Sequence, residues 1–291
     1  MTTIYRQRVS VRNSDTYRIK NPDYSNLSLT PNRTEAVSVV IPAMNEEKNI
    51  PYVLDALPRW IYECILVDGN SKDNTVRVAR EVMPSIKVVR QTRRGKGNAL
   101  ACGFNAASGD IIVMLDADCS TRPDEIKLFV ETLIETGADF AKGSRSLEGG
   151  GSADLTALRW LGNWALSKSV NVLFKTDFTD LCYGYNAFWA DILPEFDLQV
   201  EPVDPFSTSP MLWGDGFEIE TLLALRAASA NLNIVEIPSV EDSRLHGRSN
   251  LNAFRDGVRV ARTIRTEWKR RKRPIGQPQE VVVQNEKSEV A

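Results

Sequence analysis

The sequence predicts an α/β fold built on a mainly parallel β-sheet with helices on both faces. Short runs rich in apolar and β-branched residues recur along the chain, at 37–42, 63–68, 86–91, 110–115 and 138–143. Segments with apolar residues at helical spacing separate the first four runs, at 46–57, 74–82 and 97–107. Strands that alternate with helices in this way form parallel sheets whose two faces are covered by the helices.

The second half of the chain predicts further helices and one more strand. A long amphipathic segment at 155–174 follows the triple glycine 149–151, and a helix at 217–230 precedes a strand at 233–238. A last helix at 250–272 ends in basic residues. We expect the tryptophan-rich face around Trp160 and Trp164 to pack into the core. The triple glycine fits either a lid hinge or a plain linker.

Composition restricts the class of protein. The net charge of −2 argues against a general nucleic-acid binder. Four scattered cysteines without a Cys-x-x-Cys pair exclude a disulfide framework or a zinc site, and they fit a reducing cytosol. The polar N-terminus lacks the apolar run of a signal peptide, and no segment approaches the ~20 apolar residues that span a bilayer. We therefore expect a cytoplasmic protein.

The strand at 110–115 ends in two carboxylates, Asp116 and Asp118. At a separation of about 5 Å and an effective dielectric of 20, two such charges repel by roughly 3 kcal/mol. Side chains two residues apart at a strand end can point the same way and grip one divalent cation, which would offset that repulsion. Ligands of parallel sheets bind beyond the carboxyl ends of the strands, where residues 42–46 and Asp68 also fall. A solvated turn with one capping aspartate is the alternative.

Four motifs in order carry a family resemblance: VVIPAMNEEKNI, ILVDGNSKDNT, RRGKGNAL and IIVMLDADCS. Together they resemble the family-two glycosyltransferases of the A-type, Rossmann-like fold, over roughly residues 37–255. The resemblance implies a metal-dependent enzyme that uses a nucleotide-diphosphate sugar and Mg²⁺ or Mn²⁺. It implies that Pro42, Ala43, Asn45 and Glu46 meet the nucleoside and that Asp68 contacts the base. Gly69 replaces the second aspartate common in that family.

The same resemblance assigns the metal and diphosphate site. Asp116, Ala117 and Asp118 would bind the donor, and the two aspartates would hold the metal and act in catalysis. Lys96 and Gly97 lie at the start of a predicted helix, whose N-terminus favours an anionic phosphate. A surface turn is the alternative there. His246, the single histidine, would complete the metal site or contact the diphosphate; a solvated loop histidine is the alternative.

The second half is similar to the dolichyl-phosphate mannose and glucose synthase branch, through KGSR (142–145), DFTDLCYGYNAF (177–188) and SRLHGRSN (243–250). The branch usually has a basic residue where this chain has Asn186 and Asn250. Arg145, Arg244 and Arg248 are the candidates for holding an acceptor phosphate. The resemblance implies a polyprenyl-phosphate acceptor at the cytoplasmic membrane face, and a soluble hydroxyl acceptor, such as a small metabolite or a glycan, is the alternative.

A hydroxyl acceptor would need a general base, whereas an ionised phosphate needs none. The acids at the start of the helix at 217–230 offer Asp215 or Glu218 for that role, although acids there also suit the helix dipole. A sugar nucleotidyltransferase would carry a glycine-rich Arg and Lys signature after the first strand, which this chain lacks. An inactive nucleotide-sugar binder would have little need of both aspartates.

The expected organisation is therefore one domain with two functional parts. Residues 1–34 would form a flexible arm, 35–146 the nucleotide-sugar part and 147–255 the acceptor part of a domain spanning 35–255. Residues 256–274 would form a basic helix that contacts an anionic membrane surface, and 275–291 a disordered tail. The base (uracil or guanine), the sugar, the anomeric outcome and the oligomeric state stay open.

Overall fold

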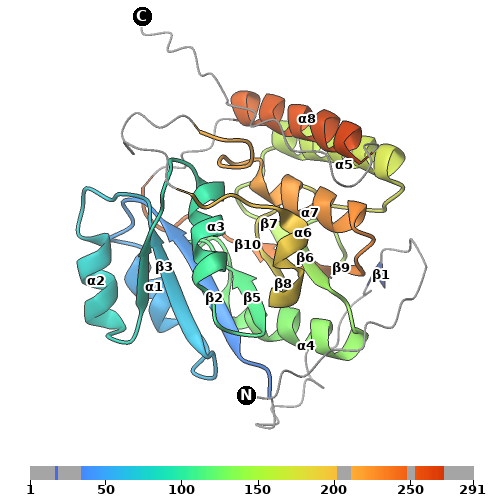
Figure 1. Ribbon diagram of the computed structural model, residues 1–291. Helices are drawn as coiled ribbons and strands as arrows, with labels where there is room; N and C mark the ends of the chain where they lie inside the picture. Colours follow the sequence, from blue (N-terminus) through green and yellow to red (C-terminus); the bar gives the residue numbers. More distant parts are fainter. Residues whose placement is uncertain (1–16, 19–33, 202–210, 248–252, 272–291) are drawn as a thin grey trace, which may run out of the picture.

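A computed structural model of the chain describes residues 17–18, 34–201, 211–247 and 253–271 (Figure 1). Within them, one sheet has the strand order β1-β9-β6-β8-β5-β2-β3-β4, and only β8 runs antiparallel to its neighbours. The strands are β1 Tyr17–Arg18, β2 Val37–Ala43, β3 Glu63–Asp68, β4 Lys87–Arg90, β5 Ile111–Met114, β6 Phe140–Ser144, β8 Asn186–Trp189 and β9 Ile234–Pro238. A second, small sheet pairs β7 Gly151–Ser152 with β10 Val240–Glu241.

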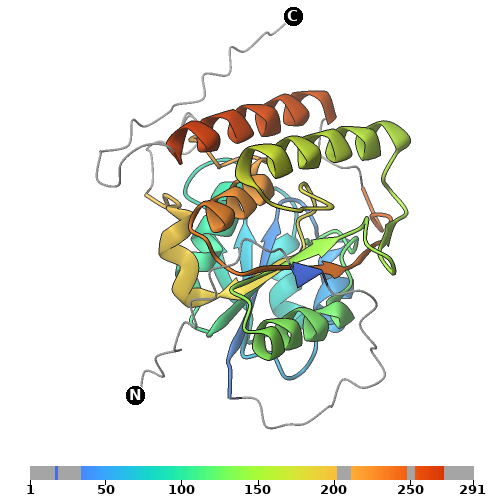
Figure 2. The same cartoon turned by 90° about the vertical axis from the view of Figure 1, so that its right-hand side faces the viewer.

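Helices cover both faces of the large sheet (Figures 1 and 2). They are α1 Ile50–Asp55, α2 Thr75–Val82, α3 Lys96–Ala106, α4 Ile126–Thr136, α5 Ala157–Phe174, α6 Leu193–Phe196, α7 Ile219–Ser229 and α8 Ala253–Arg270. The predicted α/β fold with a mainly parallel sheet is confirmed. The helices α4 and α6 and the strands β1, β7, β8 and β10 were not predicted. The segment expected to be helical at 46–57 is helical only over α1.

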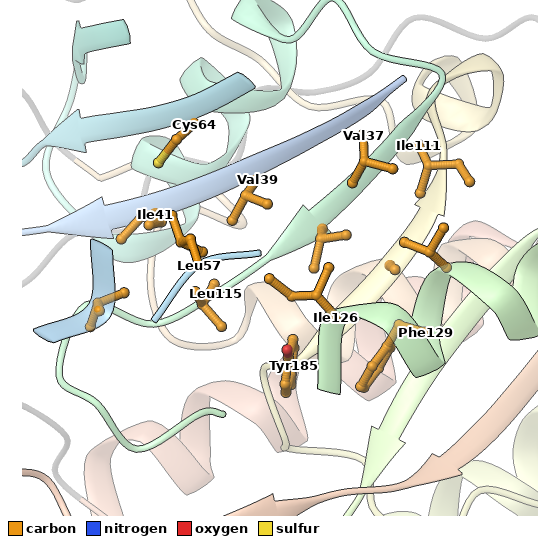
Figure 3. Packing of buried hydrophobic residues seen from close by; sticks show 14 of the residues in the cluster. Val37, Val39, Ile41, Leu57, Cys64, Ile111, Leu115, Ile126, Phe129 and Tyr185 are labelled. Atoms are coloured by element: carbon orange, nitrogen blue, oxygen red, sulfur yellow. The ribbon is translucent and has the colours of Figure 1, made fainter. Parts of the chain in front are cut away.

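The strands explain why both faces need cover. Val39 and Ile41 of β2 belong to the apolar core that includes residues of α1 and α4, whereas Val40 belongs to the opposite core with residues of α3 and α7. Figure 3 shows the first core, where Phe129 of α4 stacks on Tyr185 with ring centroids 4.4 Å apart. Since successive strand side chains alternate between faces, a strand that is apolar throughout must be buried on both.

The tryptophan-rich face of α5 is not in the core, and that prediction is wrong. Trp160 and Trp164 are about half exposed, at 49% and 48%. Helix α5 turns Asn163 and Ser167 inward instead. It packs beside α8, and Figure 2 shows the two helices side by side beyond α7.

The outer segments are described only in part. Of the predicted arm 1–34, Tyr17–Arg18 form β1 beside β9. The predicted tail 275–291 lies outside the described residues, as do Lys272 and Arg273 of the basic cluster. Among the described helices, none is both long enough and apolar enough to cross a bilayer.

Candidate active site

The two carboxylates of the DAD motif lie at the end of β5, at the carboxyl edge of the sheet. Asp116 and Asp118 are partly accessible, with side-chain exposures of 29% and 22%. A tight turn fixes Asp118: its Oδ1 accepts hydrogen bonds from the Ser120 amide at 3.1 Å and the Ser120 hydroxyl at 2.7 Å. Cys119, between Asp118 and Ser120, adopts a positive φ of 66°. The chain therefore holds both acids at an open edge.

Lys96 neutralises the first carboxylate. Its Nζ lies 2.7 Å from Asp116 Oδ1 and 2.9 Å from Glu220 Oε1. Burial would lower the pKa of Lys96, but the charges of Asp116 and Glu220 outweigh burial and raise it above its usual value. The structure thus brings Lys96 next to Asp116, and its role in donor binding stays a prediction. Sequence reasoning missed Glu220 as its second partner.

Arg244 neutralises the second carboxylate. One guanidinium nitrogen lies 3.0 Å from Asp118 Oδ2, and another donates to Glu46 Oε1. Burial raises the pKa of Glu46, partly offset by the hydrogen bond from Arg244. Arg244 was predicted to hold an acceptor phosphate; here it joins the late loop to the first strand-end loop and to the DAD turn.

The strand-end loops after β2 and β3 are tied together. Asn45, at a positive φ of 60°, donates its amide to Ser71 Oγ at 3.1 Å and accepts the Lys72 amide at 2.7 Å. The buried Asp68 accepts the Ser71 amide at 3.1 Å. A Cβ at Gly69 would lie 3.0 Å from the Met44 Cβ, so the aspartate common in the resembling family would be crowded here.

Pro42, Ala43, Asn45, Glu46 and Asp68, the predicted nucleoside contacts, therefore share one edge with Asp116 and Asp118. A hollow of about 130 Å³ beside them is lined by Asn45, Glu46, Glu47, Lys48, Asn49, Asp73, Arg244, His246 and Gly247.

His246 lines this hollow. It is exposed, its ring centroid lies 6.2 Å from that of Tyr52, and its backbone carbonyl accepts a hydrogen bond from the Asn49 side-chain amide at 3.1 Å. In the described part of the chain, no three His, Cys, Asp or Glu side chains gather closely enough to hold a metal unaided. The metal role of His246 stays a prediction.

The N-terminus of α3 is already occupied by backbone. The amides of Gly97 and Asn98 donate to the Asp215 carbonyl at 2.8 and 3.3 Å. A Cβ at Gly97 would lie 1.8 Å from the Gly214 carbonyl oxygen. Glycine at 97 thus has a packing cause, and these two amides face the 214–215 turn instead of an open phosphate position.

Asp215 forms a buried ion pair. Arg93 contacts both oxygens of its carboxylate at 2.9 Å, and the Leu212 amide donates to Oδ2 at 2.7 Å. Arg93 also donates to the carbonyls of Gln199, at 2.7 Å, and Glu201. This engagement favours a structural task for Asp215 over the general base.

Glu218 is fully buried and accepts the amides of Gly214 and Gly216 at 3.2 and 3.3 Å. Glu220, two residues further on, is the acid that reaches Asp116 through Lys96. The proposed base role of Asp215 or Glu218 stays a prediction, but the contacts place Glu220 nearer to the carboxylate pair.

Arg145 is bound into a second polar cluster. It contacts Asp180 at 2.7 Å and Glu241 at 3.0 Å and is 8% exposed. Its predicted acceptor-phosphate role would require these partners to release it. Arg248 and Asn250 lie outside the described residues.

A buried polar row crosses the sheet next to that cluster. In register, Lys142 of β6 lies between Glu236 of β9 and Asn186 of β8. Asn186 takes the position where the dolichyl-phosphate mannose and glucose synthase branch usually has a basic residue, and Lys142 is the basic residue paired with it on the neighbouring strand. Burial raises the pKa of Glu236 to about 7 and lowers that of Lys142.

A comparison with protein families now decides the classification. The model of glycosyl transferase family 2 matches residues 38–193. The chain belongs to this family. It is thus a glycosyltransferase, and the paired acids, strand-end loops and Lys96 form its candidate active site.

Two curated relatives are similar in sequence to this glycosyltransferase over most of its length. The dolichol-phosphate mannosyltransferase of Pyrococcus furiosus is 31% identical over 74% of this chain, and the match spans 59% of that longer protein. The undecaprenyl-phosphate mannosyltransferase of Micrococcus luteus is 30% identical over 79% of this chain and 93% of its own length.

A solved structure shares the fold. Glucosyl-3-phosphoglycerate synthase from Mycobacterium tuberculosis, in complex with Mg²⁺ and UDP, superposes with a TM-score of 0.65. The two proteins are 21% identical, and the alignment covers 88% of each chain. This likeness confirms the A-type architecture that the motifs predicted.

Proposed function

We propose that this glycosyltransferase moves a sugar from a nucleotide-diphosphate sugar to the phosphate of a polyprenyl phosphate at the cytoplasmic face of a membrane. The use of a nucleotide-diphosphate sugar as donor is supported by Asp116 and Asp118, which lie beside the loops after β2 and β3 at one edge of the sheet. The names of the two mannosyltransferase relatives support the acceptor half.

The residues of the edge fit a divalent cation. Two partly exposed carboxylates match Mg²⁺ or Mn²⁺, which are usually bound through one or two carboxylates with the remaining positions left to water and substrate phosphates. Asp116 and Asp118 would hold the ion, with His246 as the further ligand candidate. When bound, it supplies positive charge that stabilises the departing diphosphate.

The chain's own cations serve the same end. Lys96 lies between Asp116 and Glu220 in a fixed position, so its positive charge is already oriented toward the metal edge. Arg244 sits on a loop that reaches back to Asp118, and when released it can contact a phosphate with two parallel hydrogen bonds.

The acceptor chemistry needs no base. An ionised phosphate oxygen attacks the anomeric carbon, the bond from that carbon to the donor diphosphate breaks, and the nucleoside diphosphate leaves with the electron pair. No proton has to be removed from the acceptor. The engagement of Asp215 with Arg93 agrees with this acceptor class.

The test is a transfer assay with UDP- and GDP-linked glucose and mannose, each with Mg²⁺, Mn²⁺ or chelator. The acceptors are a short-chain polyprenyl phosphate in detergent and the matching polyprenol, which offers only a hydroxyl. We expect transfer to the phosphate alone, with kcat lowered on the order of a hundredfold by Asp118→Asn. The exposed Glu81→Gln on α2 is the matched control. Transfer to the polyprenol, or activity unaffected by chelator, would contradict the proposal.

A further inference from the structure

Helix α5 buries both polar and apolar side chains and leaves several large apolar side chains exposed. Two of its four buried residues are polar and hydrogen-bonded: Asn163 donates to Asp180 at 2.8 Å and accepts the Cys182 amide at 3.1 Å, and Ser167 accepts the Leu181 amide at 3.1 Å. The other two, Val170 and Phe174, belong to the core, and Leu166 and Leu173 pack against it. The inner face of α5 is therefore already engaged in hydrogen bonds and core packing.

The outer face of α5 is apolar. Leu158 and Val172 are 77% and 80% exposed, and Trp160, Leu161 and Trp164 are about half exposed. Leu158, Leu161, Ala165 and Val172 follow one stripe of the helix, with Lys168 between Ala165 and Val172. An exposed row of large apolar side chains of this kind marks an interaction surface.

Helix α8 lies beside this row and brings positive charge. It contains six basic residues and two acids, and both acids, Asp256 and Glu267, are buried. Its exposed charged side chains are all cationic, at Arg255, Arg262, Arg265 and Lys269. Helix α5 has no acidic residue. The α5–α8 face, defined as the exposed side chains of these two helices, therefore combines apolar and cationic groups without an exposed acid.

A hollow of about 250 Å³ opens at the same face. Trp160 and Trp164 line it together with Ser146, Ser167, Lys168, Phe178 and Thr179. Ser146 follows the carboxyl end of β6, the edge that also carries the active site. The hollow thus joins the α5–α8 face to the side of the domain expected to receive the acceptor.

We infer that the α5–α8 face docks on the surface of an anionic lipid bilayer. Leucine and tryptophan side chains of α5 enter the interfacial region, where tryptophan is enriched, and the arginines of α8 contact lipid phosphates. This inference rests on the proposed function, because it names the surface through which the enzyme would reach a membrane-bound acceptor. It differs from the sequence prediction, which placed the contact in the basic C-terminal helix alone.

Charge favours a bilayer over a second copy of the chain. In a two-fold symmetric dimer the same patch would face itself, so the excess of four positive charges on each α8 would meet an identical excess. An anionic surface is complementary instead, and each exposed cation near it adds about a fivefold gain in partitioning.

The experiment is flotation of the full chain with vesicles of phosphatidylcholine alone or with about one third phosphatidylglycerol. We expect binding to the anionic vesicles, released by salt. Leu158→Ser with Leu161→Ser should weaken it about tenfold or more, since two inserted side chains are lost. Tyr62→Ser, which removes an equally exposed aromatic ring elsewhere, should leave it unchanged.

A second pair isolates the charges. Arg262→Gln with Arg265→Gln should weaken binding to anionic vesicles by about twenty-fivefold, two cations at fivefold each. Arg77→Gln with Arg80→Gln on α2 is its control. No vesicle binding by the wild type, or equal binding by the leucine variant and the Tyr62 control, would overturn the inference. So would a wild-type dimer that the leucine variant converts to monomer in sedimentation.

Transfer to a detergent-dispersed acceptor separates this inference from the proposed function. Transfer without vesicle binding would overturn the docking face and leave the proposed function standing. Vesicle binding without transfer would do the reverse. We expect the leucine variant to keep its transfer rate in detergent, because neither leucine lines the hollow or the active site.

Discussion

The ion pair between Arg93 and Asp215 gives the most quantitative prediction. Both side chains are almost fully buried, at 1% and 5% exposure, and two contacts of 2.9 Å join them. Removing one partner of a buried pair leaves the other charge without compensation, which costs about 3–5 kcal/mol of unfolding free energy. Asp215→Asn keeps one acceptor oxygen, so we expect a loss near the lower end, about 3 kcal/mol.

The assay is urea denaturation followed by tryptophan fluorescence, at a temperature where the variant stays folded. Asp154→Asn, which removes an exposed pair with Arg159, is the control and should change the free energy by less than about 1 kcal/mol. The double variant Arg93→Met/Asp215→Leu should lose at least about 2 kcal/mol less than the sum of the two single changes, since it leaves no buried charge.

The same variant tests the alternative role of Asp215. If this residue were the general base, Asp215→Asn would lower kcat on the order of a hundredfold or more while stability changed little. A loss of unfolding free energy below about 1 kcal/mol together with such a fall in kcat would refute the structural reasoning.

Three further predictions concern the site and its surroundings. Arg244→Gln should tighten Mn²⁺ binding to the nucleotide-free protein by about tenfold in calorimetry, because the cation no longer competes for Asp118; unchanged affinity would contradict this. Gly97→Ala should lower the melting temperature by several degrees, since its Cβ would meet the Gly214 carbonyl at 1.8 Å, whereas Gly162→Ala on α5, where nothing lies within 4 Å, should not. Burial raises the pKa of Glu236 from 4.5 to about 7, so between these pH values the folded state holds a proton that the unfolded state has released. The free energy of unfolding should therefore fall as pH rises from 4.5 to 7. Urea denaturation at several pH values should show this fall, and Glu236→Gln should reduce it.

The sequence located the fold and the site edge because both depend on local patterns. A strand apolar on both faces, such as residues 37–43, can only lie inside a covered sheet, and the ends of such strands meet at one edge. The antiparallel β8 was missed because Asn186–Trp189 form a short run without a clear period. Its place between β5 and β6 depends on long-range pairing.

The details that were missed depend on orientation. Two positions that are two residues apart on a helix differ by about 200° in direction. How α7 is oriented about its axis when it packs decides whether Glu218, at its N-cap, or Glu220 faces Asp116. The apolar stripe of α5 has the same sequence pattern whether the helix turns it toward a core or toward a surface. The structure shows which face is turned inward, through the bonds of Asn163 and Ser167 to residues 180–182 and the burial of Val170 and Phe174.

The repulsion between Asp116 and Asp118 is offset first by the chain itself. Lys96 and Arg244 each form an ion pair with one of the two carboxylates, so both negative charges have a partner before a metal ion binds. An ion held at Asp118 would have to displace Arg244 from that carboxylate, which would weaken its affinity in the absence of nucleotide. A nucleotide diphosphate would reduce this penalty, because its oxygens could accept hydrogen bonds from the released Arg244 guanidinium and supply further ligands for the ion. Metal and donor should therefore bind cooperatively, each raising the affinity of the other by the same factor.

Calorimetric titration of Mn²⁺ with and without UDP or GDP measures that factor, and Arg244→Gln should reduce it. Equal cooperativity in the variant would show that Arg244 takes no part in the exchange.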